Sequence, residues 1–505
     1  MPGPPSLQML HAASRHCRYC APAAALPQGR FMAATSQRLG LAALTALVVG
    51  SMVGAGIFSL PQNVARSAGP AAAIIGWAVS GAGMLMLAFV FQALANRRPD
   101  LDTGIYAYAR EGFGNYIGFS AAWGYWVASV LGNASFFVLI FSGLGHFMPV
   151  FGEGNTPAAV AASSLLLWTV HLLVLRGLRT AAIVNGLVTV AKLLPIALFL
   201  ILAAGAFRMD VFGADFLGTP ALGDLGQQLR GMMLVTVWVF IGIEGASIYS
   251  RRAARRADVG RATVIGFLGV WLLLVLVSLL SMGVLSQAEL AALPNPSMAY
   301  VLRAIVGEWG ATVIIIGSII SVLGALLAWV LLCAEVLYAA AGDGTMPAFL
   351  GRENARGVPA NALWLSNGLI QLFLLLVLVN SGSYTGLVLL AASMSLVPYF
   401  LSTAFGVQLG WRGQAYAGGE AGIRWRDFSV ALLASAYALW LVYAGGLHNL
   451  LLSVLLYVPG VALFALTRRQ RGEQVFTPWE WVLFGAILAV AIATLVAFWR
   501  GALTL

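Results

Sequence analysis

Two glycine-rich interruptions fall inside long apolar stretches of the sequence. The first reads Gly-Ser-Met-Val-Gly-Ala-Gly-Ile-Phe over residues 50–58, and the second reads Phe-Ile-Gly-Ile-Glu-Gly-Ala-Ser over residues 240–247. Glycine permits a helix to unwind, which exposes backbone N–H and C=O groups. Free donors suit a carboxylate and free acceptors suit an ammonium group, so together they suit an α-amino acid. The alternative interpretation is close packing between helices through small residues.

Two charged residues also lie within apolar stretches. Glu244 stands between Gly242 and Gly245, and Lys192 is the only lysine of the chain. A charged side chain at the centre of a bilayer costs about 2.5–3.5 kcal/mol on insertion scales. A lipid-facing position is therefore disfavoured for both. The structural alternatives are a protonated or paired core residue for Glu244 and a side chain that reaches the interface for Lys192.

The elements that position these residues are membrane helices. The chain has 505 residues, of which 60% are hydrophobic and 9% charged, whereas soluble proteins average about 25% charged residues. A membrane span needs about 20 apolar residues, and only helices satisfy their backbone within one segment in lipid. Thirteen stretches meet or approach this length: Leu41–Pro61, Ala71–Ala95, Asn115–Phe147, Ala158–Leu175, Ala181–Ala206, Gly231–Ser250, Ala262–Leu285, Gly310–Ala341, Asn361–Asn380, Tyr384–Leu409, Phe428–Gly445, Asn449–Thr467 and Thr477–Phe498.

The glycine interruptions fall in the first and the sixth of these stretches. Two interrupted helices five spans apart are typical of transporters with an inverted repeat, whose substrate site lies at the repeat interface. The predicted fold is therefore all-α, with the first and sixth helices broken.

The arginines predict the orientation of the chain in the membrane. With the N-terminus inside, 18 arginines fall in cytoplasmic connections and five on or near the other side. This asymmetry follows the positive-inside rule. It predicts a multi-pass protein of the bacterial inner membrane with a cytoplasmic N-terminus. The net charge of +10 thus reflects topology, so we expect the lipid bilayer and no nucleic acid as partner.

The remaining motifs argue against other classes of protein. The sequence holds no H-E-x-x-H, no G-x-S-x-G and no Walker motif, and it has no soluble output domain, so neither an enzyme nor a sensor is expected. Cys17 and Cys20 form C-x-x-C beside His16, but no second pair of ligands follows, so no metal site and no cofactor are predicted. Cys333 and His171 are interpreted as packing residues within helices.

The first part of the chain has no span. Residues 1–38 are rich in Ala, Pro, Arg and His and predict a disordered cytoplasmic tail. Met32 is an alternative start, since the segment that follows it leads directly into the first span. The predicted organisation is this tail, a transport core over residues 39–410 with spans 1–10, and spans 11–13 over residues 411–505.

Four separated segments together resemble one transporter family. They are GSMVGAGIFSLPQ in the first span, GYWVASVLGN in the third, WVFIGIEGAS in the sixth and GALLAWVLLCAEVLYAAAGDGTMP in the eighth. They resemble the amino acid–polyamine–organocation (APC) superfamily, in its basic amino acid/polyamine antiporter branch and nearest to arginine/ornithine antiporters. The resemblance covers roughly residues 36–410. It implies a five-plus-five inverted repeat and exchange of cationic amino acids by alternating access.

The resemblance also implies roles for single residues. The substrate-binding positions are the backbone of the first break for the α-carboxylate, the carbonyls near the second break for the α-ammonium, and side chains of the third, sixth and eighth spans: Ala55, Gly56, Ile57, Asn133, Trp238, Ile241, Gly242 and Trp329. A gate or coupling role is implied for Tyr125, Lys192, Glu244 and Tyr399. Lys192 would bridge the unwound first span, where sodium-coupled relatives bind their ion.

Two departures from the family pattern and several alternatives stay open. Ala55 stands where relatives often carry a hydroxyl, and a thirteenth span exceeds the usual twelve. The alternatives to arginine/ornithine exchange are a proton-coupled importer and exchangers of arginine for agmatine or of lysine for a polyamine. Relatives are often dimers, so a homodimer is a further option.

Overall fold

The computed structural model describes residues 40–101, 105–177, 181–243, 254–380 and 384–500, apart from the side chains of residues 181–190, 256–257 and 380. All regular structure in these segments is helical, without any strand. The predicted tail, and with it Met32, Cys17 and Cys20, lies outside the described residues, as does Glu244.

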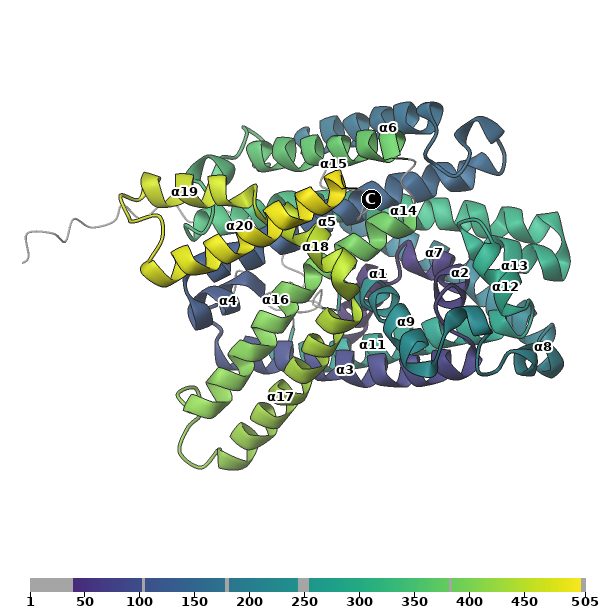
Figure 1. The fold of residues 1–505 in the computed structure, drawn as a ribbon, viewed down its shortest axis with the longest axis horizontal. Coiled ribbons are helices and arrows are strands. Elements are labelled where there is room, and N and C mark those ends of the chain that lie inside the picture. Colours follow the sequence, from purple (N-terminus) through teal and green to yellow (C-terminus); the bar gives the residue numbers. More distant parts are fainter. Residues whose placement is uncertain (1–39, 102–104, 178–180, 244–253, 381–383, 501–505) are drawn as a thin grey trace, which may run out of the picture. The chain divides into compact units, whose positions relative to one another are not determined.

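The helices follow the predicted spans closely, with short helices in the connections (Figure 1). In chain order they are α1 (Leu41–Met52), η1 (Gly56–Ser59), α2 (Leu60–Ala65), α3 (Pro70–Arg97), α4 (Ile105–Phe113), α5 (Asn115–Gly145), η2 (Pro149–Phe151), α6 (Pro157–Leu175), α7 (Ala181–Gly205), α8 (Met209–Ala214), η3 (Pro220–Leu222), α9 (Leu225–Phe240), α11 (Arg256–Met282), α12 (Gln287–Ala292), α13 (Ser297–Val306), α14 (Glu308–Gly342), η5 (Ala348–Gly351), α15 (Ala360–Asn380), α16 (Tyr384–Arg412), α17 (Ala421–Ala444), α18 (Gly446–Tyr457), α19 (Gly460–Gln470) and α20 (Pro478–Trp499).

Each of the thirteen predicted stretches contains a helix. Within the described residues, ten helices are long and apolar enough to cross a membrane, or eleven when the bent pair at the first break is taken as one span. Ala191–Gly205, the part of α7 whose side chains are described, is also apolar but is shorter than a span. The all-helical, multi-span fold is thus confirmed, and the count of thirteen crossings stays a prediction.

The first span is broken at its glycines, as predicted. α1 ends at Met52, and the chain resumes as η1 and α2 at an angle of 45° to it. At the break the Gly54 N–H turns back to the Met52 carbonyl at 3.0 Å instead of continuing the helical ladder. The helix end therefore leaves carbonyls without helical partners.

The helix of the sixth span ends at the second glycine motif. α9 stops at Phe240, and Gly242 follows with φ of +106°. A left-handed backbone of this kind favours glycine, because a Cβ would clash with the main chain. The end of α9 thus coincides with the start of the second glycine motif. Residues 244–247 of this motif lie outside the described residues.

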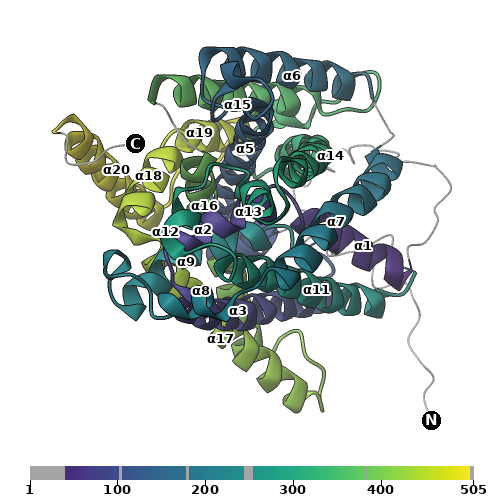
Figure 2. The same cartoon turned by 90° about the vertical axis from the view of Figure 1, so that its right-hand side faces the viewer.

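The most internal helix is α5. Of its most apolar 18-residue stretch 94% is buried, against 11% for α20. α5 packs against α14 and α16, and α6 packs against α15, which lies beside it in both views (Figures 1 and 2). Around the first break, α1 packs on α11 and α7, and η1 contacts α9. Hence α7, α9, α11 and α13 all contact the broken first helix.

The segments that connect the long helices form hydrogen bonds with one another in two groups. One group carries the arginines predicted to be cytoplasmic: Arg110 Nη1 donates to the Asp343 carbonyl at 2.9 Å, and Arg471 Nη1 donates to the Gly344 carbonyl at 3.2 Å. The other group joins α2 to the helices that precede α14, where Arg66 Nε donates to the Ala291 carbonyl at 3.1 Å. These helices, α12 and α13, were absent from the predicted set of elements because they are too short to span a bilayer.

Candidate functional site

Lys192 joins α7 to the break in the first span. Its Nζ donates to the Gly50 carbonyl at 2.7 Å and to the Val53 carbonyl at 2.6 Å, and the residue is only 1% exposed. These carbonyls are available because α1 ends at Met52. Hydrogen bonds with a charged partner are roughly twice as strong as neutral ones. The side chain thus lies at the break and does not reach an interface.

Ser51 connects the first break to the second. Its Oγ donates to the Gly242 carbonyl at 2.9 Å and also lies 2.9 Å from the Val48 carbonyl of its own helix. At Gly242 an added Cβ would lie 2.8 Å from the Ser51 carbonyl oxygen, so the two backbones approach closely. Ser51 of the first glycine motif and Gly242 of the second, about 190 residues apart, are therefore in direct contact.

Replacing Ser51 with alanine removes the hydrogen bond between the two breaks. One neutral hydrogen bond contributes about 0.5–1.5 kcal/mol, so we expect exchange of substrate to fall about threefold to tenfold. The measurement is the initial rate of amino acid exchange in proteoliposomes. Ser164→Ala is the matched control, because the Ser164 hydroxyl of α6 likewise bonds both within its helix, to the Val160 carbonyl, and to another helix, accepting from Gln371 of α15 at 2.9 Å. Equal rates for Ser51→Ala and the control would contradict a joint role of the breaks.

The break also presents two free backbone donors. The N–H groups of Ala55 and Gly56 make no hydrogen bond with any residue that the structure describes. Both residues are buried, and so is Ile57. Buried N–H groups are nearly always paired, with protein, water or ligand. The arrangement is therefore an incomplete site for an acceptor such as a carboxylate.

The indole of Trp238 forms one wall beside these donors. A Cβ built on Gly56 would lie 3.1 Å from Cδ1 of this ring, and one on Gly132 of α5 would lie 3.1 Å from its far edge. The Phe136 ring lies 6.2 Å away, centroid to centroid. The structure thus brings Gly56 and Trp238 together, as the sequence predicts. A side chain at either glycine would crowd the ring, because these distances are shorter than most real Cβ contacts.

Two further predicted site residues, Asn133 and Trp329, lie on α5 and α14. Asn133 follows Gly132 directly and is fully buried, with its Nδ2 donating to the Ser129 carbonyl at 2.9 Å. Trp329 is half-buried on α14 and packs against the core. The helices α5 and α14 contact each other, and Asn133 reaches the sulfur of Cys333, which lies one helical turn after Trp329 on α14.

The predicted gate residues are only partly brought together. Tyr125 on α5 and Tyr399 on α16 are both buried, on helices that pack against each other. The Tyr399 ring meets the Phe91 ring edge-on at 6.0 Å. Glu244, the third predicted member of the gate, lies outside the described residues.

A set of polar atoms beside Trp238 was missed by sequence reasoning. The Trp238 Nε1, the Ser59 hydroxyl and the Tyr384 hydroxyl are all buried and lack a hydrogen-bond partner of normal geometry, although the Tyr384 hydroxyl lies near the other two. Tyr384 is the first residue of α16, so only the tertiary fold brings it to the break. The sequence offers one signal for this set, because Ser59 directly follows the first glycine motif.

His171 is buried between α6 and α15, and its Nε2 has no hydrogen-bond partner among the described residues. It is fully buried on α6, its Nδ1 lies 2.9 Å from the Asn367 amide nitrogen of α15, and its ring meets the Trp364 ring at 4.2 Å. Among the residues that the structure describes, no group of three His, Cys, Asp or Glu side chains could hold a metal ion.

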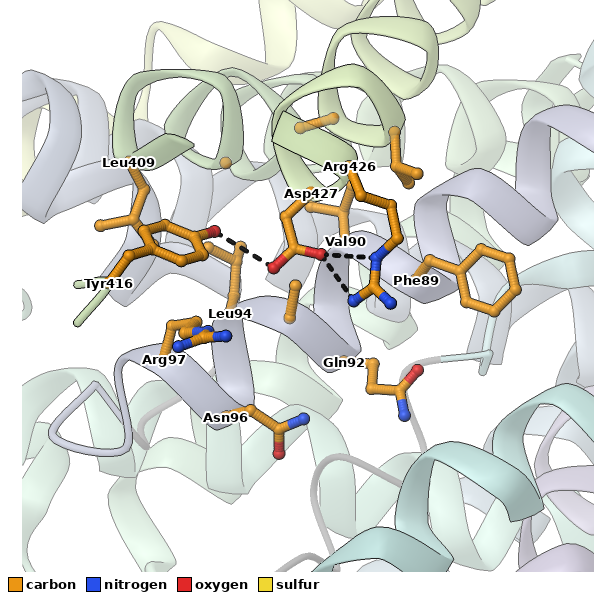
Figure 3. Close-up of a pocket in the computed structure, with 14 residues that line it drawn as sticks. Phe89, Val90, Gln92, Leu94, Asn96, Arg97, Leu409, Tyr416, Arg426 and Asp427 are labelled. Carbon is orange, nitrogen blue, oxygen red and sulfur yellow. Dashed lines mark hydrogen bonds and ion pairs between the residues drawn. The ribbon is translucent and has the colours of Figure 1, made fainter. Parts of the chain in front are cut away.

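A separate cavity of about 590 Å³ lies between α3, α16 and α17 and contains none of the predicted site residues (Figure 3). Its charged residues are paired with neighbours: Arg97 forms an ion pair with Glu420 at 2.7 Å, outside the lining, and the others pair within it. Asp427 accepts from Arg426 at 2.9 Å and from the Tyr416 hydroxyl at 3.2 Å, and Arg97 lies 4.4 Å from the Tyr416 ring centre. Burial and the Asp427 carboxylate raise the pKa of Tyr416 to about 12, so the hydroxyl stays a donor. The network braces the α16–α17 connection against α3.

Known proteins are similar in sequence to this chain over almost its whole length. The chain matches the family model described as amino acid permease over residues 39–487. It is 57% identical over 479 residues to a protein of Pseudomonas aeruginosa named arginine/ornithine antiporter, with 93% of this chain and 99% of the relative covered.

Two further relatives carry related names. An L-lysine transport protein of Corynebacterium glutamicum is 45% identical over 488 residues, which cover 94% of this chain and 97% of that protein. An arginine/agmatine antiporter of Chlamydia trachomatis is 41% identical over 459 residues, which cover 90% and 95%. With its broken first helix, its buried lysine and these matches, the chain belongs to the amino acid permease family of the APC superfamily.

Proposed function

We propose that the protein is a membrane antiporter that exchanges cationic amino acids, arginine for ornithine, by alternating access. The observation that carries the proposal is the pair of free, buried N–H donors of Ala55 and Gly56 beside the Trp238 ring. They supply what a substrate carboxylate needs, at a point where no residue that the structure describes provides an acceptor. The name of the P. aeruginosa relative, which this chain matches over 99% of its length, supports the choice of substrates.

The positions that we propose for the charged groups of the substrate follow from the residues around these donors. The α-carboxylate accepts from the first break, at Ala55, Gly56 and Ile57, and the α-ammonium donates to the carbonyls near Ile241 and Gly242. The Gly242 carbonyl already accepts from Ser51, but a carbonyl oxygen has a second lone pair.

The aliphatic stem of the substrate then packs on the Trp238 ring. Its distal cationic group extends between α5 and α14, toward Asn133 and Trp329. This arrangement uses both breaks and both helices that line them, which is the reason for preferring an amino acid to a simple amine.

The coupling to exchange has a physical basis in the same donors. A carrier that closes without substrate leaves buried donors unpaired, at a cost of about 1–3 kcal/mol for each group. This cost opposes reorientation of the empty carrier, so one substrate leaves as another enters. Arginine and ornithine each carry one net positive charge at neutral pH, so their exchange moves no net charge.

The gate and the membrane orientation complete the proposal. Tyr125, Tyr399 and Glu244 close the site toward the arginine-rich loops, which are cytoplasmic by the positive-inside rule. The N-terminal tail is then cytoplasmic, residues 39–410 form an inverted-repeat transport core in the inner membrane, and residues 411–505 add the last spans. A homodimer fits this architecture. A catalytic role is not part of the proposal.

Counterflow in proteoliposomes tests the substrate assignment. Vesicles loaded with unlabelled arginine are diluted into trace labelled arginine, ornithine, lysine, agmatine or putrescine at two pH values. We expect labelled arginine and ornithine to accumulate transiently in preference to the polyamines. Preferential uptake of agmatine would favour the arginine/agmatine alternative that the Chlamydia relative's name suggests. Net uptake into vesicles without internal substrate, driven by a pH gradient, would favour the proton-coupled importer.

A further inference from the structure

Gln62, in the second half of the broken first span, uses its backbone and both polar atoms of its side chain in contacts with one distant segment. Its N–H donates to the Ser297 hydroxyl at 3.1 Å, and its Nε2 donates to the Leu293 carbonyl. Its Oε1 accepts from Nδ2 of Asn295 at 2.8 Å. These partners lie between the end of α12 and the first residue of α13. Gln62 is only 3% exposed, so water does not compete for its hydrogen bonds in this conformation.

The same segment is also held from its other side, by α5. The Ser142 hydroxyl of α5 donates to the Asn295 carbonyl at 2.6 Å. Residues 293–297 therefore join α2 to the most internal helix of the bundle. Gln62, residues 293–297 and Ser142 together form what is named the outer clasp below.

The outer clasp lies on the path of a substrate that arrives from outside the cell. In the proposed orientation the first span begins at the cytoplasm, so η1 and α2 lie between the break and the outside. All four residues of η1 and all six residues of α2 are buried. Both α12 and α13 pack against α2, and α13 also packs against η1. Among the described residues, α2 and its neighbours thus close the outer side of the break, and a substrate reaches it only when they separate.

We propose that Gln62 is a positioning residue that keeps the outer side of the transporter closed while the site faces the cytoplasm. Hydrogen bonds suit a contact that must open in every cycle. Each polar group that opening exposes finds water as a new partner, so the net loss is small compared with the strength of the bond. Apolar surface gains no such partner from water. The inference rests on the proposed function, and it gives a role to the segment between α12 and α13.

The test measures how often the outer side opens in the full-length protein, in spheroplasts that express it. Ser59→Cys provides the reporter, because Ser59 of η1 is fully buried and its hydroxyl has no hydrogen-bond partner among the described residues. A membrane-impermeant methanethiosulfonate reagent added outside reaches this cysteine only when α2 moves away. The parent protein with serine at this position gives the background from the native cysteines.

Two variants of Gln62 remove the side-chain half of the clasp in this reporter. Gln62→Ala, and Gln62→Met with its similar volume, each remove the bonds to Leu293 and Asn295. We expect both to raise the rate of external labelling about tenfold, because the closed state alone loses these bonds. Ser142→Ala removes one bond on the other side of the clasp and should raise the rate about threefold.

Gln371→Ala is the matched control in the same reporter. The Gln371 side chain of α15 also makes two hydrogen bonds, donating to the Ser164 hydroxyl at 2.9 Å and accepting from the Trp168 indole at 3.1 Å. These bonds join α15 to α6 and are not part of the clasp. We therefore expect Gln371→Ala to leave the labelling rate close to that of Ser59→Cys alone.

The outcomes separate this inference from the proposed function. Gln62 variants that label no faster than Gln371→Ala overturn the role of Gln62, and equal increases for Gln62→Ala and Gln371→Ala overturn it too, since they indicate general loosening. Ser142→Ala decides the question if neither Gln62 variant folds. Labelling does not depend on which substrate is carried, so a protein that exchanges no arginine overturns the proposed function alone. Labelling from the cytoplasmic side only overturns the proposed orientation, and the outer clasp with it.

Discussion

We expect replacement of Lys192 with methionine to reduce arginine exchange about a hundredfold. The substitution keeps the length and burial of the side chain but removes both hydrogen bonds to the Gly50 and Val53 carbonyls. Hydrogen bonds that involve a charged group contribute about 1.5–3 kcal/mol each, so the loss of two weakens the bridge by about 3 kcal/mol or more. The first span then loses the contact that fixes its unwound segment to α7. The measurement is the initial rate of arginine/ornithine exchange in proteoliposomes.

The control for this prediction lies on the same helix. Leu194→Met alters α7 two residues away, at a side chain that is 67% exposed and makes no bridge. It should exchange arginine at close to the wild-type rate. A Lys192→Met protein that does the same would show that the bridge has no part in transport.

Adding one methyl group at Gly56 has the second-largest expected effect. The new Cβ of Gly56→Ala would lie 2.7 Å from Cγ1 of Val239 and 3.1 Å from the Trp238 ring. Overpacking of this kind costs about 1–3 kcal/mol and displaces the neighbouring groups. Since the free N–H of Gly56 and the Trp238 ring both belong to the proposed site, we expect arginine exchange to fall at least about tenfold, with a raised KM.

Another glycine supplies the comparison for Gly56→Ala. Gly269 lies on the membrane helix α11, and a Cβ there would meet nothing within 4 Å. Gly269→Ala should therefore leave both the rate and the KM close to wild type. If the two alanine variants behave alike, the close approach of Gly56 to the indole is irrelevant to transport.

The broken first helix could be predicted from sequence because its cause is local. Three glycines within seven residues permit unwinding, and the structure has α1 ending at Met52. Lys192 was identifiable for a similar reason, since a charged side chain within an apolar stretch must find a partner. The identity of that partner, the pair of carbonyls at Gly50 and Val53, depends on the packing of α7 against α1.

The contacts between distant elements could not be predicted in the same way. Nothing in the local sequence marks Ser51, Tyr384 or Cys333. Their contacts depend on which distant residues the fold places beside them. A serine in a membrane helix usually bonds to its own backbone, and only the tertiary structure shows that Ser51 also reaches Gly242. Likewise, nothing in the α14 sequence indicates that the Cys333 sulfur accepts from Asn133.

The elements outside the spans show a further limit of the sequence signal. Hydropathy identifies stretches of about 20 apolar residues, so α12 and α13 were not expected as helices. Yet they carry contacts that hold α2, the second half of the broken helix, through Gln62: its N–H donates to the Ser297 hydroxyl at 3.1 Å, and its side chain donates to the Leu293 carbonyl. Such contacts depend on one polar residue near the end of a helix. A single residue of this kind leaves no periodic pattern in the sequence.

Efflux of preloaded substrate tests the central claim, that the protein is an exchanger, most directly. Proteoliposomes filled with radiolabelled arginine are diluted into buffer of the same pH, without a membrane potential, with or without external ornithine. The account predicts rapid efflux only when ornithine is present outside, because the empty carrier does not readily reorient. Efflux that proceeds equally fast into buffer without ornithine would contradict it.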